Sequence, residues 1–580
     1  MYRKPYVLLL LFLFSSGLVA QKKVIPGKTV IANALKEIKD FQKKETKQDS
    51  LAGKPLGSYT EADFLRRYTF YRSVYLKLNK IDHTKLALKD QVNLELLQYT
   101  IKDELSQYQF KAYLNPILSD EGFHTWLPSL AREVLFTKKE YEDYIKKLKD
   151  IPRYVNENID LMRTGLKLGI SQPRNILNGY DNTYVQHIVS EEDKSVFWKP
   201  FTRQPQGIAN DEWIRLKGQG ADAILNYAVT GFQKVKDFFD KEYLMVTRTT
   251  TGVSHFPEGL AWYQDRAHHF TSTSLSYETI YQLGLKEVER IKAEMLTTMK
   301  AVNFEGSFQE FINFLRSDPK FYASSPEQLL KEASFIAKKA DGMLPLLFGK
   351  LPRQPYGVDP VPEHLAPTYT SGRYSGAPIS SKNAGKYWVN TYNLKSRTLY
   401  TLESLTLHEA VPGHHLQIAL TQELKDLPEF RQNLYVNAFG EGWGLYAEYL
   451  GTEMGFYKDP YSLFGKLTYE MWRACRLVID VGLHAKGWTK EQAVAYLSEH
   501  TALSLHEVNT EINRYISWPG QALAYKVGEL KIKELRKRAE EKLKDKFDIR
   551  EFHDTVLSQG TVTLKILEVM VDNYIKEKLK

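Results

Sequence analysis

Apolar residues recur at three- and four-residue spacings over most of the chain, a pattern that predicts α-helices. The spacing is clearest in four stretches, which we expect to form helices: 60–78, 138–168, 277–300 and 521–544. The chain contains no internal repeat, no heptad run and no low-complexity linker. The sequence therefore predicts a predominantly all-α fold, with residues 21–344 and 345–580 as two parts of one unit.

One interruption opens the second part. Residues 345–381 are dense in Pro and Gly, which predicts a long ordered loop rather than a helix. The segment that follows, 386–394, is rich in aromatic and β-branched residues and is the best strand candidate in the chain. Because peptides often pair with an exposed strand edge, Val389 and Asn390 are candidate substrate-binding residues. On periodicity alone, a strand without a substrate role is equally compatible.

The first twenty residues have the pattern of a secretory signal. Arg3 and Lys4 precede an apolar stretch at 7–14, and small residues then lead to a cleavage position near Ala20. That stretch is too short for a membrane anchor, and no cysteine at the junction offers a lipid attachment site. We therefore expect a periplasmic or secreted protein with no stable membrane anchor after the signal is removed.

Charge and cysteine content restrict the chemistry. The net charge of +9 falls to +7 when Arg3 and Lys4 leave with the signal. The remaining lysines are spread over polar helix faces and resemble no nucleic-acid-binding module. Cys475 is the only cysteine, which excludes an intrachain disulfide and a thiolate metal cluster. Any metal ion must be bound by His, Glu or Asp.

The segment 408–415, His-Glu-Ala-Val-Pro-Gly-His-His, contains the residue types of a zinc peptidase centre. Such a centre uses two neutral imidazoles and usually a carboxylate as ligands, with one position left for water. A second carboxylate takes a proton from that water as it attacks the scissile carbonyl, and Glu409 is the candidate for this role. We therefore expect a metal site that includes His408.

The spacing differs from the usual His-Glu-x-x-His of a helical zinc site. On a straight helix, neither His414 nor His415 could share a metal ion with His408. Pro412 and Gly413, however, can break the helix and return one of these histidines to the metal. The spacing leaves open which histidine is the second ligand and which lies beside the site.

A second segment, 439–448, supplies two carboxylates near the start of a predicted helix. Glu441 lies 27 residues after His414, a normal distance for a third ligand from a following helix. Glu448 lies seven residues further on, on nearly the same helix face but two turns away. That position suits a residue that hydrogen-bonds to a ligand.

These two segments resemble the hallmark motifs of a bacterial family designated domain of unknown function 885. The matching motifs are His-Glu-x-x-Pro-Gly-His-His-Leu-Gln at 408–417 and Glu-Gly-Trp-x-x-Tyr-x-Glu at 441–448. Similar segments at 263–295, 476–488 and 514–528 extend the resemblance over most of the mature chain. The family is itself similar to gluzincin peptidases such as the carboxypeptidase Taq and angiotensin-converting-enzyme groups.

The resemblance implies a clamshell-like helical fold with a deep cleft and one Zn²⁺ at its base. It also implies His408, His414 and Glu441 as the metal ligands and Glu409 as the general base. The family motif thus favours the first histidine after Pro-Gly.

Three further polar residues share one helix face, because Arg476, Asp480 and His484 recur at four-residue spacing. His484 could hydrogen-bond to the tetrahedral intermediate with Asp480 orienting it, while Arg476 pairs with Asp480 or a substrate carboxylate. A structural ladder of charged side chains fits the same spacing.

Two tyrosines, Tyr515 and Tyr525, are candidates to donate a hydrogen bond to the oxyanion. We favour Tyr525, because it lies just inside a helix that Pro519 begins. Arg514 belongs to the same matching segment and is a candidate substrate-binding residue.

The sequence thus predicts an exported zinc metallopeptidase of carboxypeptidase or dipeptidase type. Its substrates would be short peptides or peptide C-termini. One alternative keeps the site and changes the bond, giving an amidase that acts on cell-wall or other small amides. Another is a non-catalytic peptide-binding protein on a peptidase scaffold, against which the intact Glu409 argues.

Overall fold

The structure, a computed structural model, describes residues 26–580 except 364 and 426. The predicted signal at 1–20 lies outside the described residues. Helices dominate the rest and one small sheet interrupts them, which confirms the predicted all-α class. Among the residues described, no helix combines the length and the apolar character needed to cross a membrane.

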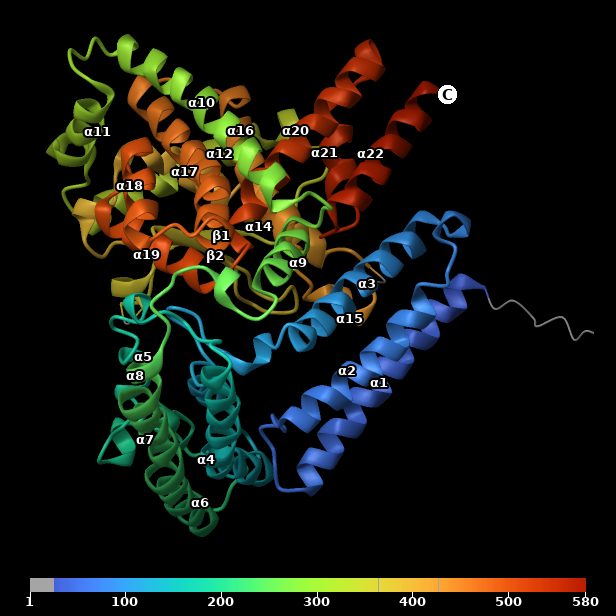
Figure 1. Cartoon of the computed structure of the whole chain (residues 1–580), viewed down its shortest axis with the longest axis vertical. Coiled ribbons are helices and arrows are strands. Elements are labelled where there is room, and N and C mark those ends of the chain that lie inside the picture. The colour runs from blue at the N-terminus through green and yellow to red at the C-terminus, as the bar shows by residue number, and fades with distance from the viewer. Residues whose placement is uncertain (1–25, 364, 426) are drawn as a thin grey trace, which may run out of the picture.

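The N-terminal part forms two groups of helices (Figure 1). The first group has an apolar cluster of its own and contains α1 (Gly27–Leu51), α2 (Glu61–Leu78) and α3 (Leu88–Gln109). The second group contains α4 (Lys138–Lys167), α5 (Asn182–Val185), α6 (Asn210–Ala223), α7 (Val229–Phe238) and α8 (Leu244–Val246). The helices expected at 60–78 and 138–168 are confirmed as α2 and α4. Both begin at a threonine capping box, which satisfies backbone donors that a helix start would leave free.

The remaining helices form the larger upper part of the molecule (Figure 1). Before the sheet come α9 (Gly259–Thr271), α10 (Tyr277–Ala301), α11 (Phe308–Ser317) and α12 (Pro326–Leu347). After it come α13 (Leu402–Glu409), α14 (His414–Gln422), α15 (Glu429–Gln432), α16 (Asn437–Glu453), α17 (Pro460–Ala485), α18 (Lys490–His500), α19 (Leu505–Ser517), α20 (Ala524–Leu543), α21 (Ile549–Leu557) and α22 (Leu564–Leu579). The helices expected at 277–300 and 521–544 are confirmed as α10 and, after one short 3-10 turn, α20.

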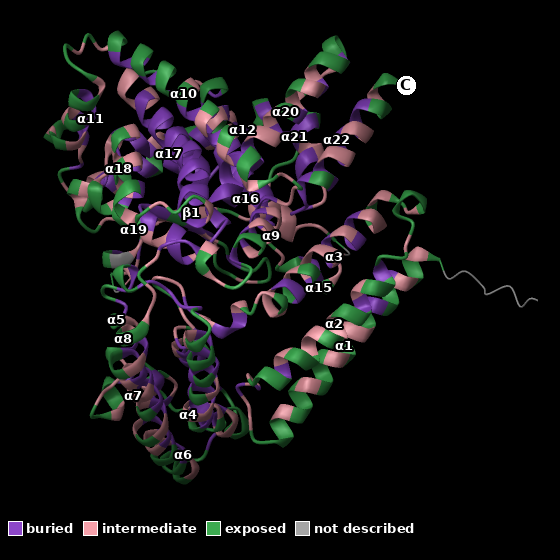
Figure 2. Cartoon of the chain, viewed as in Figure 1, coloured by how far each residue is buried: buried purple, intermediate pink, exposed green. Residues whose placement is uncertain are grey.

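The core is built around α17, which is buried without interruption from Phe464 to His484 (Figure 2). Helix α10 packs along α17, and α16 packs along α20. The main apolar cluster runs from Leu56 to Ile575, so both parts of the chain contribute to one core.

The Pro- and Gly-rich segment 345–381 is more ordered than a loop. It starts inside α12 and contains β1 (Tyr356–Pro360) and β2 (Gly372–Ser375). The strand expected at 386–394 is β3 (Gly385–Val389), which pairs with β1 in parallel and with β2 antiparallel. The order is β1-β3-β2, so β3 is the central strand. Its expected role as an exposed edge is therefore wrong, because both of its edges are paired.

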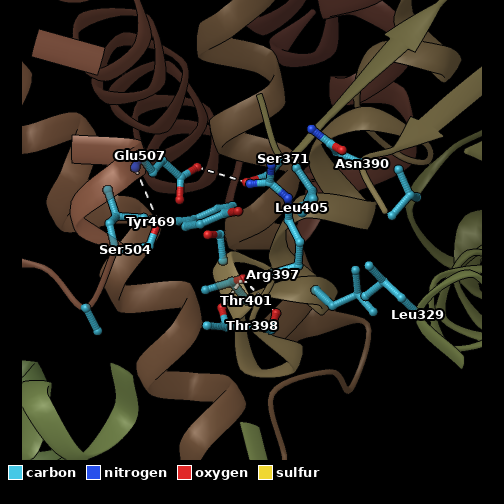
Figure 3. A pocket seen from close by; sticks show the side chains of 15 residues that line it. Leu329, Ser371, Asn390, Arg397, Thr398, Thr401, Leu405, Tyr469, Ser504 and Glu507 are labelled. Atoms are coloured by element: carbon cyan, nitrogen blue, oxygen red, sulfur yellow. Dashed lines mark hydrogen bonds between the residues drawn. The ribbon is translucent and has the colours of Figure 1, made fainter. Parts of the chain in front are cut away.

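Val389 and Asn390 are buried at the end of β3. The side-chain amide of Asn390 donates to three backbone carbonyls of the loop before β2. Both residues line a cavity of about 20 Å³ together with Ser371, Arg397 and Glu507 (Figure 3), which is room for about one water molecule. Ser371 donates to Glu507 at 2.9 Å. These contacts hold the start of β2 in place, and they leave neither Val389 nor Asn390 available as a substrate edge.

Candidate metal centre

The motif at 408–415 spans a complete break between two helices. Helix α13 ends at Glu409 and α14 begins at His414, so the expected kink is a separation into two helices. Gly413 is required at the break, because a Cβ there would collide with the backbone carbonyl of His408. The chain reversal brings the rings of His408 and His414 to a centroid distance of 4.7 Å, nearly perpendicular to each other.

Glu441, in the first turns of α16, completes a cluster of three ligand atoms. Its Oε2 lies 3.7 Å from His408 Nε2 and 3.5 Å from His414 Nε2. All three atoms lie within 4.8 Å of one another. The two N–O distances are long for hydrogen bonds. They match the roughly 3.4 Å that separates ligand atoms around a tetrahedral zinc ion at about 2.1 Å from each ligand. The donor set and its spacing therefore fit one zinc ion.

Glu448 fixes the orientation of His408. His408 Nδ1 donates to Glu448 Oε1 at 2.7 Å, which leaves Nε2 free to bind a metal ion. Glu448 also accepts from Ser404 and lies 3.5 Å from Arg473. Gly444 makes room for the imidazole, since a Cβ there would lie 2.7 Å from its ring. The sequence-based role of Glu448 agrees with this geometry.

The electrostatics around His408 favour a positive charge. Burial by itself lowers the pKa of this imidazole, but the neighbouring carboxylates of Glu441, Glu448 and Glu409 outweigh burial and raise the pKa to about 10. His408 and His414 together hold the pKa of the Glu441 carboxyl group well below its usual range, against the effect of burial. The carboxylates of this buried cluster thus attract a cation, which can be a proton or a metal ion.

Glu409, the predicted base, is the last residue of α13 and is held by β2. Its Oε2 accepts the backbone N–H of Tyr374 at 2.7 Å. The backbone N–H of Asn390 donates to the carbonyl of Ser371, just before β2. Because hydrogen-bonded pairs alternate along an antiparallel ladder, Arg373 and Ser375 are the β2 residues whose backbone groups bond to β3. The N–H of Tyr374 points away from β3, and β2 therefore presents the sheet edge that faces Glu409.

His415 lies outside the ligand cluster. Its Nδ1 bonds to the hydroxyl of Tyr374 at 2.9 Å, and its ring packs against that of Tyr356. Burial lowers the pKa of His415 to about 4, so this imidazole is neutral. The geometry places His414, rather than His415, with His408 and Glu441, and it places His415 behind β2.

Of the two candidate tyrosines, only Tyr525 reaches the neighbourhood of the ligands. Its hydroxyl accepts from Arg514 Nη2 at 3.2 Å. Burial and the Glu441 carboxylate raise the pKa of Tyr525. Arg514 and Arg476 lower the pKa by a larger amount, so it lies below the ordinary value for tyrosine. The hydroxyl of Tyr515 instead accepts from Trp472 at 2.7 Å and Arg476 at 2.8 Å, away from the ligand cluster.

The ion pair expected between Arg476 and Asp480 and the hydrogen bond expected between Asp480 and His484, all in α17, are not formed among the described residues. His484 is fully buried, and its two ring nitrogens bond to the backbone of Val253 and Tyr515. Burial lowers the pKa of His484 to about 3, which keeps it neutral. With both nitrogens occupied, His484 has no donor left for a reaction intermediate. The catalytic role expected for it is therefore wrong.

Asp480 does not orient His484, because it accepts from Tyr263 at 2.6 Å and from the backbone N–H of Gly520 at 3.1 Å. Arg476 pairs with Glu511 at 2.8 Å rather than with Asp480. Its guanidinium also stacks 4.1 Å from the centre of the Tyr525 ring. Arg476 therefore positions Tyr525 from behind.

Two residues beside the ligands were not expected from the sequence. Tyr435 donates from its hydroxyl to Glu441 Oε1 at 3.1 Å. Arg373, in β2, lies close enough to Glu409 and Glu441 that their charges, with that of Tyr369, raise its pKa against the effect of burial. Tyr435 precedes α16 and Arg373 lies in the Gly-rich segment, so neither stands within a recognisable motif. A strand assignment for 372–375 would have suggested Arg373.

Residues 30–571 match the family described as "Bacterial protein of unknown function (DUF885)". The chain belongs to this family. No curated protein matches it. Among solved structures, it is similar to the "putative lipoprotein from Colwellia psychrerythraea", with 27% identity, a TM-score of 0.83 and coverage of 96% of this chain and 100% of that one.

A "putative lipoprotein of unknown function from Shewanella oneidensis" has the same fold at 15% identity. Its TM-score is 0.69, over 93% of this chain and 99% of that one. At this identity the likeness concerns the fold alone.

Proposed function

We propose that this DUF885 protein is an exported zinc-dependent peptidase that hydrolyses short peptides. The observation that carries the proposal is the cluster of His408, His414 and Glu441, with separations suited to one zinc ion and with Glu409 beside it. Two histidines, one glutamate and a neighbouring carboxylate are the ligand set and base of the gluzincin type of peptidase.

Zinc, when bound, supplies a Lewis acid that polarises the scissile carbonyl and lowers the pKa of water. Glu409 accepts the proton of the attacking water and delivers it to the leaving amine. The backbone N–H of Tyr374 holds the Glu409 carboxylate in one orientation for this transfer. In this proposal the hydroxyl of Tyr525 donates to the oxygen on which negative charge develops. The free edge of β2 can align the substrate main chain.

Export is proposed from two observations. The N-terminal twenty residues have the pattern of a secretory signal, and two similar solved structures are each described as a "putative lipoprotein". The only cysteine of the given sequence, Cys475, is buried in α17.

The decisive experiment compares zinc-loaded wild type with Glu409→Gln on a mixed peptide library, with product identification by mass spectrometry. Glutamine can still accept the N–H of Tyr374 but cannot take a proton, so we expect unchanged zinc content and at least a 100-fold lower turnover. The matched control is Glu403→Gln, on the same helix, whose carboxylate also accepts a backbone N–H, that of Tyr457. This variant should retain activity.

Each alternative outcome identifies a different function. Full activity of Glu409→Gln would refute the mechanism. Cleavage of small amides without cleavage of peptides would indicate an amidase. Tight peptide binding by zinc-loaded wild type without turnover would indicate a peptide-binding protein.

A further inference from the structure

A cavity of about 830 Å³ includes Glu121 in its lining, and the carboxyl group of Glu121 interacts electrostatically with Arg514 and with Arg373, which is close to Glu409 and Glu441 of the candidate metal centre. The cavity walls come from all three groups of helices, namely α2 and α3, α4, and the upper part with α9 and α19 (Figure 1). Cavities of this size hold small-molecule or short-peptide ligands. The lining is rich in aromatic residues, among them Tyr108, Tyr113, Trp126, Trp262, Phe270 and Trp518.

Tyr525 connects this cavity to the metal ligands. Tyr525 and the cavity residue Phe270 belong to one small apolar cluster, and Trp518 packs against that cluster. Phe270 and Trp518 are themselves in edge-to-face contact, with centroids 5.9 Å apart. The hydroxyl end of Tyr525 lies in the field of Glu441. Tyr525 thus shares an apolar cluster with the aromatic wall of the cavity and interacts electrostatically with the carboxylate of Glu441.

Three arginines line the cavity, and they differ in how their charge is balanced. Arg67 pairs with Glu45 at 3.1 Å, and Arg266 pairs with Asp103 at 2.6 Å and Asp265 at 2.7 Å. Within the described part of the chain, Arg248 forms no ion pair.

Arg248 is nevertheless held in a fixed orientation. Its Nε donates to Ser171 O at 2.6 Å, and its Nη1 donates to the carbonyls of Thr250 and Gly252. The guanidinium also lies 4.9 Å from the centre of the Phe256 ring. Its Nη2 has no hydrogen-bond partner among the described residues. An arginine fixed by neutral acceptors, with one donor group unused in a cavity wall, is preorganised for an anion.

The cavity also contains acidic residues without an ion pair in the described structure, Glu104 and Glu121. Burial raises the pKa of both carboxyl groups, and neither forms an ion pair with Arg248. The guanidinium of Arg248 stays charged at physiological pH. The unbalanced charge of Arg248 therefore calls for an anionic group on the ligand.

We propose that this cavity binds the C-terminal part of a short peptide with large apolar or aromatic side chains, and that Arg248 binds its free terminal carboxylate. The proposal rests on the peptidase function proposed above and makes the enzyme an exopeptidase that acts near the C-terminus. The aromatic walls bind the side chains, and Arg248 sets the distance between the chain end and the scissile bond.

The test is a cycle of two changes, one in the peptide and one in the protein. Peptides of three to five residues ending in phenylalanine are prepared with a free or an amidated C-terminus. Their Kd is measured by calorimetry on zinc-loaded Glu409→Gln, with and without Arg248→Met. Amidation should weaken binding at least tenfold when Arg248 is present and less than twofold when it is absent.

The matched control is Arg316→Met. Arg316 is likewise held by three backbone carbonyls, of Leu503, Ser498 and Thr501, but it does not line the cavity. Arg316→Met shows how much peptide binding changes when any arginine held by backbone carbonyls is lost. In this variant amidation of the peptide should still weaken binding at least tenfold. An equal effect of amidation with and without Arg248, or no effect in either protein, would overturn the proposal.

The cycle separates this inference from the proposed function. Binding is measured without turnover, so a coupling between Arg248 and the carboxylate would stand even if no peptide were hydrolysed. Conversely, hydrolysis by wild type with no coupling in the cycle would refute the carboxylate site alone and leave the peptidase function intact.

Discussion

Two clusters of buried charges lie on neighbouring helices and are balanced in different ways. The first surrounds Lys526 of α20, which is fully buried and contacts Glu529 at 2.6 Å, Glu470 at 2.9 Å and Glu287 at 3.2 Å. Lys466 bonds to Glu470 as well, at 2.5 Å. Each carboxylate of this lysine cluster has a basic partner from the chain itself.

The second cluster is the candidate metal centre, where Glu409, Glu441 and Glu448 surround His408 and His414. Here the one permanently charged basic group within 4 Å, among the described residues, is Arg473, at 3.5 Å from Glu448. Buried charges are costly unless they are paired. The lysine cluster is balanced without a ligand, whereas the three carboxylates of the metal cluster have a single lysine or arginine within 4 Å among the described residues. This difference is the physical reason to expect a cation at the second cluster and none at the first.

The strongest test of a cation at the second cluster is to change the two adjacent histidines, His414 and His415, one at a time. His414→Gln should abolish zinc binding and activity, because it removes a ligand, whereas His415→Gln should retain one zinc ion per chain. Elemental analysis and thermal unfolding with added zinc measure the difference. At a zinc concentration 100 times its Kd, wild type and His415→Gln should gain about 2.7 kcal/mol of stability, and His414→Gln nothing. The reverse pattern would assign the ligand to His415.

The lysine cluster should behave in the opposite way. Lys526→Met leaves buried carboxylates without their cation and should lower the free energy of unfolding by about 3–5 kcal/mol. Zinc content per folded molecule should not change. Lys531→Met, five residues further along α20 in a partly exposed ion pair with Glu534, should cost about 0–1 kcal/mol. Loss of zinc from folded Lys526→Met would show that the two clusters are coupled.

The two clusters also differ in how far the sequence predicts them. The metal cluster was predictable because its residues stand in two short motifs, and Pro412 with Gly413 indicated the break between α13 and α14. The lysine cluster was not, because its members come from three distant helices and have no distinctive spacing. The four stretches with the clearest apolar spacing were also predicted correctly as helices, because that spacing is a signal within each stretch and does not depend on distant residues.

The failures concern contacts that only the packed structure defines. Arg476, Asp480 and His484 do share a face of α17, as their spacing requires, but their partners come from α9, α19 and the chain around Val253 and Gly520. β3 was recognised as a strand, yet its central place depends on β1 and β2, whose residues lie in a Pro- and Gly-rich segment. Periodicity specifies a face, and tertiary packing decides what that face contacts.

Gly444 offers a smaller test of the metal cluster. In Gly444→Ala the new Cβ would lie 2.7 Å from the His408 ring and would displace this ligand. We expect zinc affinity to fall 10- to 100-fold, as it does when residues that orient a ligand are changed. Competition titration with a chelator measures it. The control is Gly342→Ala, in α12, where a Cβ meets nothing within 4 Å and should stabilise the helix by up to about 1 kcal/mol. Unchanged zinc affinity in Gly444→Ala would mean that His408 is not a ligand.

Asp480 shows a third way to accommodate a buried carboxyl group, by protonation. It is fully buried, has no lysine or arginine within 4 Å among the described residues, and bonds only to Tyr263 and the N–H of Gly520. Burial raises its pKa to about 7, although Tyr263, Gly520 and the more distant Arg476 act in the opposite direction. A carboxyl group with a raised pKa binds its proton more tightly in the folded state than in the unfolded state. Its contribution to stability therefore falls as pH rises from about 4 to about 7 and then levels off.

Asp480→Asn mimics the protonated form and should remove this pH dependence. Between pH 6 and pH 8, wild type should lose about 1.4 kcal/mol of unfolding free energy relative to Asp480→Asn, measured by denaturant titration at both pH values. Asp265→Asn, whose carboxylate is paired with Arg266, is the control and should not reproduce the effect. A constant difference between wild type and Asp480→Asn at the two pH values would mean that Asp480 is ionised throughout, with a cation nearby that balances it. Asp480 would then belong with the lysine cluster, in which buried carboxylates are matched by basic side chains.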